Sequence, residues 1–208
     1  MADHYYSKKP TVANDRHTVQ TVLRGKSYRF ITDAGVFSKQ DIDYGSRLLI
    51  ETMRIEEADA VLDVGCGYGP IGIAAAGLAT RGEVTMVEIN ERAVALAAEN
   101  AAANGMTRAR AIQSDLFERL EGRRFTKILT NPPIRAGKQV VHRIFEQAYD
   151  HLEEGGQLWI VIQKKQGAPS ALSKLESLFG SDWVEEAAKD KGYRIYCATR
   201  MAVDGQAE

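Results

Sequence analysis

Two stretches of this chain combine residue types and spacings that suit chemistry. Residues 61–72 read VLDVGCGYGPIG, an apolar run that contains an acid and is followed by alternating glycines. Glycines at this spacing let the backbone turn tightly and let a ligand lie against bare peptide groups. The second stretch is Thr130-Asn131-Pro132-Pro133, in which an amide side chain precedes two rigid residues. The first stretch therefore predicts a site for a ligand that contains adenosine, and the second predicts polar contacts to a reacting group.

The glycine-rich stretch fits two cofactors. Residues 67–72 follow the pattern GxGxxG, and Glu88 lies 21 residues after Gly67, as in sites for dinucleotides such as NAD. This pattern alone is weak evidence, because glycines that pack a strand against a helix without any ligand have the same spacing. S-adenosylmethionine is the second candidate, and other residues must distinguish the two.

Three further features favour S-adenosylmethionine over NAD. Asp63 lies at a strand end, where its carboxylate can hydrogen-bond a cationic amino group or a water but would repel a pyrophosphate. Ser114-Asp115 places a second acid at a strand end, able to accept a hydrogen bond from an adenine amino group. Asn131-Pro132-Pro133 ends a further strand, and NAD enzymes have no general use for that motif. We therefore expect S-adenosylmethionine as the cofactor.

The Asn-Pro-Pro motif suits methyl transfer to an amine. The lone pair of an exocyclic amino group on a base is conjugated into the ring, so it must be turned out of the ring plane and aimed at the methyl carbon. The Asn131 side-chain oxygen and the Pro132 carbonyl are two acceptors that can impose this geometry, and Pro133 helps to keep the loop rigid. Because charge on the sulfonium disperses during transfer, positioning supplies most of the catalysis and no metal or strong base is needed.

Alternating strands and helices must hold these residues in place. The expected strands cover 61–64, 83–88, 108–113, 126–129 and 157–163, and the expected helices cover about 41–53, 70–79, 91–103, 138–152 and 168–179. Pro70 and Asn90 are suited to begin two of these helices. Two strands at about 183–187 and 193–199 follow each other directly, and residues 18–23 and 28–32 alternate as in a hairpin.

This order predicts an α/β fold with a doubly wound, mostly parallel seven-stranded sheet of the Rossmann-like type. The last two strands imply an antiparallel strand at one edge. We expect an N-terminal β/α extension at 1–50 packed on the same domain, a catalytic domain at 51–202 and a tail at 203–208.

The composition narrows the class of protein. Hydrophobic residues make up 44% and charged residues 26% of the chain, as in soluble globular proteins. No apolar run reaches the roughly 18 residues of a membrane span, and the N-terminus has no apolar signal segment. Cys66 and Cys197 are far apart and have no metal-ligand spacing. We therefore expect a cytoplasmic protein that uses no metal and no membrane.

The charge is small overall but unevenly distributed. A net charge of −1 argues against a protein that coats nucleic acid indiscriminately. Residues 108–144, however, hold nine Lys or Arg and only three Asp or Glu. A solvated surface explains such a segment, and so does a positive rim beside a site for an anionic partner.

The order of DxGxGxG, Glu88, Asp115 and Asn-Pro-Pro resembles class I S-adenosylmethionine-dependent methyltransferases. More narrowly, Gly35-Val36-Phe37-Ser38 with Gly45-Ser46, followed by NPPIRAGK at 131–138, is similar to the RsmC-type family of small-subunit ribosomal RNA guanine-N2 methyltransferases. The likeness covers nearly the whole chain, and this combination is more specific than the glycine loop. It implies ribosomal RNA or the small ribosomal subunit as the partner.

The resemblance also implies roles for individual residues. Asp63 would serve the methionine amino group of the cofactor, Glu88 both ribose hydroxyls and Asp115 the adenine amino group. The remaining cofactor contacts would come from Gly65, Gly67, Gly69, Ser114 and Phe37. Substrate contacts are expected from Ile134, Arg135, Lys138, Arg143 and Lys164. The four cations follow the carboxyl ends of strands, where doubly wound sheets bind ligands, so they would meet RNA phosphates; a charged helix face is the alternative explanation.

Two departures from the family pattern concern the substrate. Many amine methyltransferases with this motif carry an aromatic residue after Asn-Pro-Pro to stack on the target, whereas Ile134 stands here. Phe37 is the obvious replacement, although it could equally be a core residue. RsmC-type proteins are often tandem duplications, and this chain corresponds to the catalytic copy alone. Substrate binding would then depend on residues 1–50, on a homodimer or on further contacts, so monomer and homodimer both remain open.

These observations predict a methyltransferase that acts on an exocyclic amine of an RNA base, most specifically guanine N2 of small-subunit ribosomal RNA. The same motif also serves adenine N6 and protein glutamine amides, so both acceptors remain alternatives. An NAD-dependent oxidoreductase and a binding module without catalysis are more remote interpretations.

Overall fold

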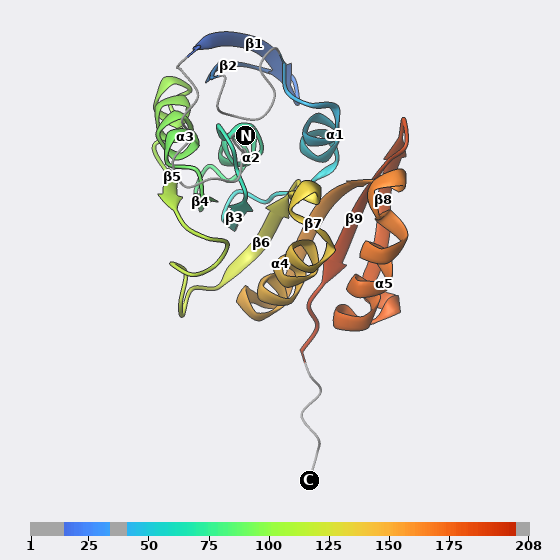
Figure 1. Ribbon diagram of the computed structural model, residues 1–208. Helices are drawn as coiled ribbons and strands as arrows, with labels where there is room; N and C mark the ends of the chain where they lie inside the picture. The colour runs from blue at the N-terminus through green and yellow to red at the C-terminus, as the bar shows by residue number, and fades with distance from the viewer. Residues whose placement is uncertain (1–14, 34–40, 203–208) are drawn as a thin grey trace.

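A seven-stranded sheet forms the centre of the molecule. The computed structural model describes residues 15–33 and 41–202. The sheet strands are β3 (Ala60–Val64), β4 (Glu83–Glu88), β5 (Ala109–Gln113), β6 (Phe125–Thr130), β7 (Leu152–Gln163), β8 (Val184–Asp190) and β9 (Tyr193–Thr199). Their order is β5-β4-β3-β6-β7-β9-β8 (Figure 1). Neighbours from β5 to β7 are parallel, whereas β9 is antiparallel to both β7 and β8.

The predicted doubly wound, mostly parallel seven-stranded sheet is confirmed. The antiparallel strand β9 lies one place in from the edge, and β8 forms the edge itself. The main shift in a boundary is in β7, which begins at Leu152 rather than Gln157 because Leu152 already pairs with Phe125 across an irregular step in the ladder.

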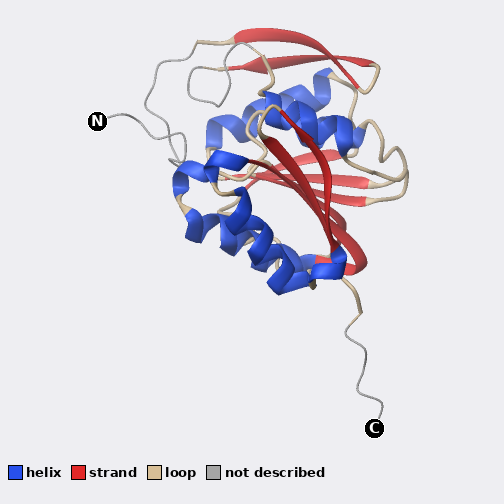
Figure 2. Cartoon of the chain, turned by 90° about the vertical axis from the view of Figure 1, so that its right-hand side faces the viewer, coloured by secondary structure: helices blue, strands red, loops and turns tan. Residues whose placement is uncertain are grey.

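Helices cover both faces of the sheet (Figure 2). They are α1 (Tyr44–Thr52), α2 (Pro70–Ala76), α3 (Glu91–Ala103), α4 (Lys138–His151) and α5 (Ala168–Phe179), with short 3-10 turns η1 (Ile134–Ala136), η2 (Lys164–Gln166) and η3 (Ser181–Trp183). Successive strand residues point to opposite faces, so Val61 packs in the cluster with α1, α2 and α3 while Leu62 packs with α4 and α5. Burial on both faces explains the continuous apolar runs at 61–62 in β3 and 158–162 in β7.

The predicted N-terminal hairpin is confirmed as β1 (His17–Leu23) and β2 (Lys26–Thr32). It forms a separate layer outside α1, α2 and α3 (Figure 1). Asn100 on α3 donates to the Ile31 carbonyl at 2.8 Å and accepts from its N–H at 2.7 Å. Asn104 pairs in the same way with Arg29, at 2.8 and 3.0 Å. Asn100 and Asn104 are four residues apart, which corresponds to a rise of about 6 Å along a helix, and Arg29 and Ile31 are two residues apart, which corresponds to about 6.6 Å along a strand. The two side chains therefore match alternate positions of β2.

Candidate active site

A cavity of about 510 Å³ lies at the carboxyl ends of the central strands. The loops after β3, β4, β5 and β6 line it, together with the start of α1, one face of α4 and the first residue of β9. Chain order reverses at β3, since β4 and β5 lie on one side of it and β6 and β7 on the other. Doubly wound folds bind ligands at such a switch point.

The glycine loop after β3 contributes two of its glycines to the cavity. Gly65 and Gly67 have φ angles of 71° and 55°, in the left-handed region that glycine adopts without strain. A Cβ placed on Gly65 would meet nothing within 4 Å, so the backbone there borders open space. This bare, open stretch of peptide is suited to a ligand that lies flat against it.

Gly69 and Gly72 have packing functions instead. A Cβ on Gly69 would come within 2.9 Å of Ile73 Cδ1 and 3.3 Å of Ala97 Cβ, which places this glycine against the helices. A Cβ on Gly72 would lie 2.5 Å from Met86 Cγ. Gly69, predicted to contact the cofactor, does not line the cavity. The close approach of α2 and α3 to the loop is the physical reason.

Asp63 lies beneath the glycine loop rather than on the cavity surface. It is fully buried, and its Oδ2 accepts a hydrogen bond from the Gly72 N–H at 2.8 Å. Its Oδ1 is buried without a hydrogen-bond partner in the described residues. Burial raises the pKa of Asp63 to about 7, against the opposing effect of the Gly72 hydrogen bond. An unpaired buried carboxylate oxygen is costly, and a cationic amino group or a water in the loop would satisfy it.

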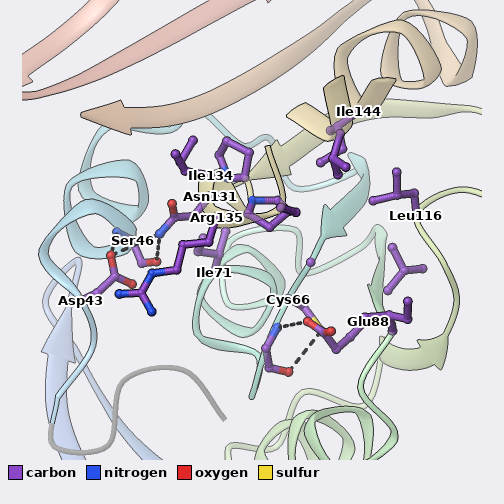
Figure 3. Close-up of a pocket in the computed structure, with 18 of the residues that line it drawn as sticks. Asp43, Ser46, Cys66, Ile71, Glu88, Leu116, Asn131, Ile134, Arg135 and Ile144 are labelled. Carbon is purple, nitrogen blue, oxygen red and sulfur yellow. Dashed lines mark hydrogen bonds between the residues drawn. The ribbon is translucent and has the colours of Figure 1, made fainter. Parts of the chain in front are cut away.

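Glu88 at the end of β4 does line the cavity, and it is held by the backbone (Figure 3). Its Oε2 accepts from the Gly67 N–H and its Oε1 from the Asn90 N–H, both at 3.0 Å. Burial nevertheless raises its pKa, with the hydrogen bonds from Asn90 and Gly67 acting in the opposite direction. The strand end, the glycine loop and the cap of α3 therefore fix this carboxylate in one orientation.

Ser114 and Asp115 follow β5 and both line the cavity. The Ser114 hydroxyl donates to the Leu116 carbonyl at 2.9 Å and accepts from the Arg119 N–H at 3.2 Å. The Ser114 hydroxyl therefore stabilises the loop in which it lies. No hydrogen bond joins the Asp115 side chain to another residue of 15–33 or 41–202, so its carboxylate is the one suited to a ligand amino group.

Asn131, Pro132 and Pro133 line the opposite side of the cavity, directly after β6. The Asn131 Nδ2 donates to Asp43 Oδ1 at 3.2 Å and to Ser46 Oγ at 3.0 Å (Figure 3). Within residues 15–33 and 41–202, no hydrogen bond reaches Asn131 Oδ1 or the Pro132 carbonyl. Both acceptors therefore lack a hydrogen-bond partner among these residues.

The five residues predicted to contact the substrate divide into two groups. Ile134, Arg135 and Arg143 line the cavity, whereas Lys138 and Lys164 do not. Lys138 is the first residue of α4, and the face of this helix that lines the cavity carries Val140, Arg143 and Ile144. Phe37 lies outside the described residues.

Sequence reasoning missed three lining residues on the side of Asn131. Asp43 and Ser46 begin α1, where the Asp43 side chain accepts from the Ser46 N–H as an N-cap. That spacing is a helix-start signal, but it does not reveal a contact with Asn131, which follows β6. Tyr193 at the start of β9 also lines the cavity, and only the strand order brings it there.

No group of three His, Cys, Asp or Glu residues in the described part of the chain could hold a metal ion. Likewise, none of the helices formed by these residues is long and apolar enough to cross a bilayer.

Comparisons with known proteins agree with this architecture. The sequence profile described as methyltransferase small domain matches residues 27–197. The uncharacterized protein YbxB of Bacillus subtilis is 52% identical over 203 residues, which cover 97% of this chain and 100% of that protein. Ribosomal RNA small subunit methyltransferase C of Escherichia coli is 33% identical over 204 residues, which cover 95% of this chain and 57% of that protein.

Among solved structures, the Thermus thermophilus 16S rRNA N2 G1207 methyltransferase RsmC, in complex with AdoMet and guanosine, superposes with a TM-score of 0.78 at 28% identity. The match covers 92% of this chain and 52% of that one. The chain therefore spans little more than half the length of the RsmC proteins that it resembles, and the full length of YbxB.

Proposed function

The chain belongs to the methyltransferase small domain family, and from this premise we propose that it transfers a methyl group from S-adenosylmethionine to an exocyclic amine of an RNA base. The acceptor that the site and its relatives support best is guanine N2 of small-subunit ribosomal RNA. A small-subunit substrate would place the protein in the cytoplasm.

The observation that carries this proposal is that two different sets of polar groups line opposite sides of one cavity. Glycine backbone and the acids Glu88 and Asp115 line one side, and the acceptors of Asn131 and Pro132 line the other. The first side suits the adenosine of S-adenosylmethionine, whose hydroxyl and amino groups are hydrogen-bond donors. The second side suits an N–H donor that has to be held still.

The residues present fit the cofactor. Glu88, with its carboxylate already fixed, would hold the ribose, and Asp115 the adenine amino group. The unpaired Asp63 Oδ1 under the loop would take the methionine amino group, directly or through a water. When bound, S-adenosylmethionine supplies a methyl group on a positively charged sulfur.

On the acceptor side, Asn131 Oδ1 and the Pro132 carbonyl would accept the two N–H groups of the target amine. This turns the nitrogen lone pair out of conjugation and toward the methyl group. Asn131 and Pro132 would thereby hold the amine against the methyl group that S-adenosylmethionine would supply, and the proton that the nitrogen gives up would pass to solvent. Such positioned acceptors are the part of the reaction that the chain itself contributes.

Three observations favour RNA as the substrate. The Escherichia coli relative is named a ribosomal RNA methyltransferase, and the Thermus thermophilus structure contains guanosine. Arg135 and Arg143 add exposed positive charge at the cavity, where phosphates of a bound strand would be attracted.

Transfer of a tritiated methyl group to naked 16S ribosomal RNA, assembled small subunits, transfer RNA and total protein tests the proposal. We expect label in ribosomal RNA, and nucleoside analysis should recover N2-methylguanosine. Label in N6-methyladenosine or only in protein would overturn the choice of acceptor. Calorimetry with S-adenosylmethionine and with NAD tests the cofactor separately, and absence of binding to S-adenosylmethionine would refute the whole proposal.

A further inference from the structure

We propose that Asp43 and Ser46 are positioning residues for methyl transfer, because they hold the Asn131 side chain in the orientation that turns its oxygen toward the acceptor amine. This inference rests on the proposed function and deepens it. It assigns a role to the first turn of α1, which is remote in sequence from both the glycine loop and the Asn-Pro-Pro motif.

The three side chains meet at one wall of the cavity (Figure 3). Asp43 Oδ1 accepts twice, from the Ser46 N–H at 3.0 Å and from Asn131 Nδ2 at 3.2 Å. Ser46 Oγ is the second acceptor for Asn131 Nδ2, at 3.0 Å. Ser46 is 4% exposed, so water has little access to compete for these bonds.

The arrangement decides which end of the Asn131 side chain faces the substrate. A carboxamide carries a donor NH₂ at one end and an acceptor oxygen at the other. A carboxylate can only accept, so the NH₂ must face Asp43, and the oxygen would be repelled there. With one N–H on Asp43 and the other on Ser46, both donors of the carboxamide are occupied and only the oxygen remains.

The orientation matters because the target amine is itself a donor. A flipped Asn131 would present its NH₂ to the N–H groups of the substrate, and the amine would lose the contact that turns it toward the methyl group. Donation to a carboxylate also polarises the amide and strengthens its oxygen as an acceptor. Asp43 and Ser46 therefore act through Asn131, without contact to the reacting atoms.

Asp43 both caps α1 and positions Asn131, so the variants must distinguish these two roles. Serine caps helices about as well as aspartate, but its hydroxyl lies one bond closer to the backbone. D43S should therefore preserve α1 while it withdraws the acceptor from Asn131. D43N retains an Oδ1 that can accept both bonds. S46A removes the second acceptor with little change in volume.

In methyl-transfer assays, D43S and S46A should each lower kcat about tenfold or more, with the KM for RNA, the affinity for S-adenosylmethionine and the melting temperature nearly unchanged. D43N should recover most of the kcat that D43S loses. S177A, which removes an exposed hydroxyl bonded to the Lys174 carbonyl, is the matched control. A loss of kcat that follows the melting temperature, or equal losses in D43S and D43N, would overturn the proposal.

A swapped pair provides the second measurement. N131D alone sets two carboxylates against each other, whereas D43N/N131D restores a donor and an acceptor with their positions exchanged. The double variant should be more active than N131D, which is strongly non-additive behaviour for two neighbouring positions. Simple addition of the two losses would argue for separate structural effects.

The orientation of Asn131 can also be read without any substrate, from the side-chain ¹⁵N resonances of the wild-type protein and D43S. An Asn131 NH₂ that points into the cavity of the wild type would overturn the inference even in an active enzyme. The expected orientation in a protein that methylates no RNA would contradict only the proposed function.

Discussion

The two sides of the cavity are built in different ways. On the cofactor side, Asp63, Glu88 and Ser114 are held by backbone of the neighbouring strand–loop–helix units, as Glu88 is by Gly67 and Asn90. On the acceptor side, Asn131 is held by side chains 85 and 88 positions away in the chain. A cofactor that is shared by many reactions needs one constant set of contacts. Backbone groups can supply these contacts whatever side chains the neighbouring residues carry.

The acceptor side, in contrast, depends on which side chains the first turn of α1 and the start of β9 place beside the loop after β6. Changes there alter the acceptor geometry without disturbing the glycine loop. Under the proposed function, substrate choice would depend on α1, η1, α4 and β9, and cofactor use on β3, β4 and β5. Substitutions on the two sides should therefore have separable effects.

The largest difference between the effect on kcat and the effect on cofactor affinity should come from N131A. The acceptor for the amine is lost, so we expect kcat to fall about 10²–10³-fold, as when one preorganised hydrogen-bonding group is removed from an active site. Affinity for S-adenosylmethionine should change less than about threefold. Single-turnover transfer and calorimetry measure the two quantities, and an active N131A protein would contradict the mechanism.

Glu88→Ala should have the opposite signature. It removes a charged acceptor from the ribose site, together with its hydrogen bonds from the Gly67 and Asn90 N–H groups. We expect the Kd for S-adenosylmethionine to rise about 10–100-fold, because hydrogen bonds to charged groups contribute about 1.5–3 kcal/mol. E88Q, which keeps an acceptor of the same shape, should lie between wild type and alanine. Equal Kd values for E88A and wild type would exclude Glu88 from the ribose site.

Asp63 should make cofactor binding depend on pH. Its pKa is raised from 3.8 to about 7 by burial, so the free native protein holds a proton that the unfolded chain releases. Asp63 therefore lowers the stability of the free protein progressively as pH rises from about 4 through about 7. A cationic amino group binds the ionised form, so affinity should increase roughly eightfold from pH 6 to pH 7.5.

The control for this dependence is D63N, in which the affinity should be nearly constant over the same range. Isothermal titration at several pH values measures it. The same slope in D63N and wild type would show that another group is responsible.

The smallest effect should come from Gly45→Ala on the acceptor side. A Cβ at this position would lie 2.8 Å from Tyr193 Cε1 and 3.2 Å from Asp43 Oδ1. The Tyr193 ring can move aside, so we expect a loss in kcat of only a few-fold and no change in the Kd for S-adenosylmethionine. A large loss of cofactor affinity would show that the two sides are more tightly coupled than their hydrogen bonds indicate.

Most of the fold was predictable because its signals are local. Asn90 caps α3 and Pro70 opens α2, as predicted from residue type and position. Helix ends were less accurate, since α2 stops at Ala76 rather than at about Ala79. The Asn-Pro-Pro motif and Glu88 were also found from their places at strand ends, where parallel strands gather functional groups.

The rest of the site was not predictable from sequence, because it depends on how helices pack against the glycine loop and on which face of a helix is turned to the cavity. Gly65, Gly67, Gly69 and Gly72 look alike in the motif, yet the packing of α2 and α3 separates the two that border the cavity from the two that do not. Likewise, Lys138 and Arg143 belong to the same basic segment, but the phase of α4 turns only Arg143 to the cavity.

The sequence by itself determined the order of strands and helices, the glycine loop and the acids and Asn-Pro-Pro motif at the strand ends. These follow from periodicity, capping and backbone freedom, which act between residues close in the chain. Only the tertiary structure decided that Asp43 and Ser46 meet Asn131 and that Tyr193 joins the same wall. The sheet order, set by burial of whole faces, brings these distant segments together, and no local pattern encodes that contact.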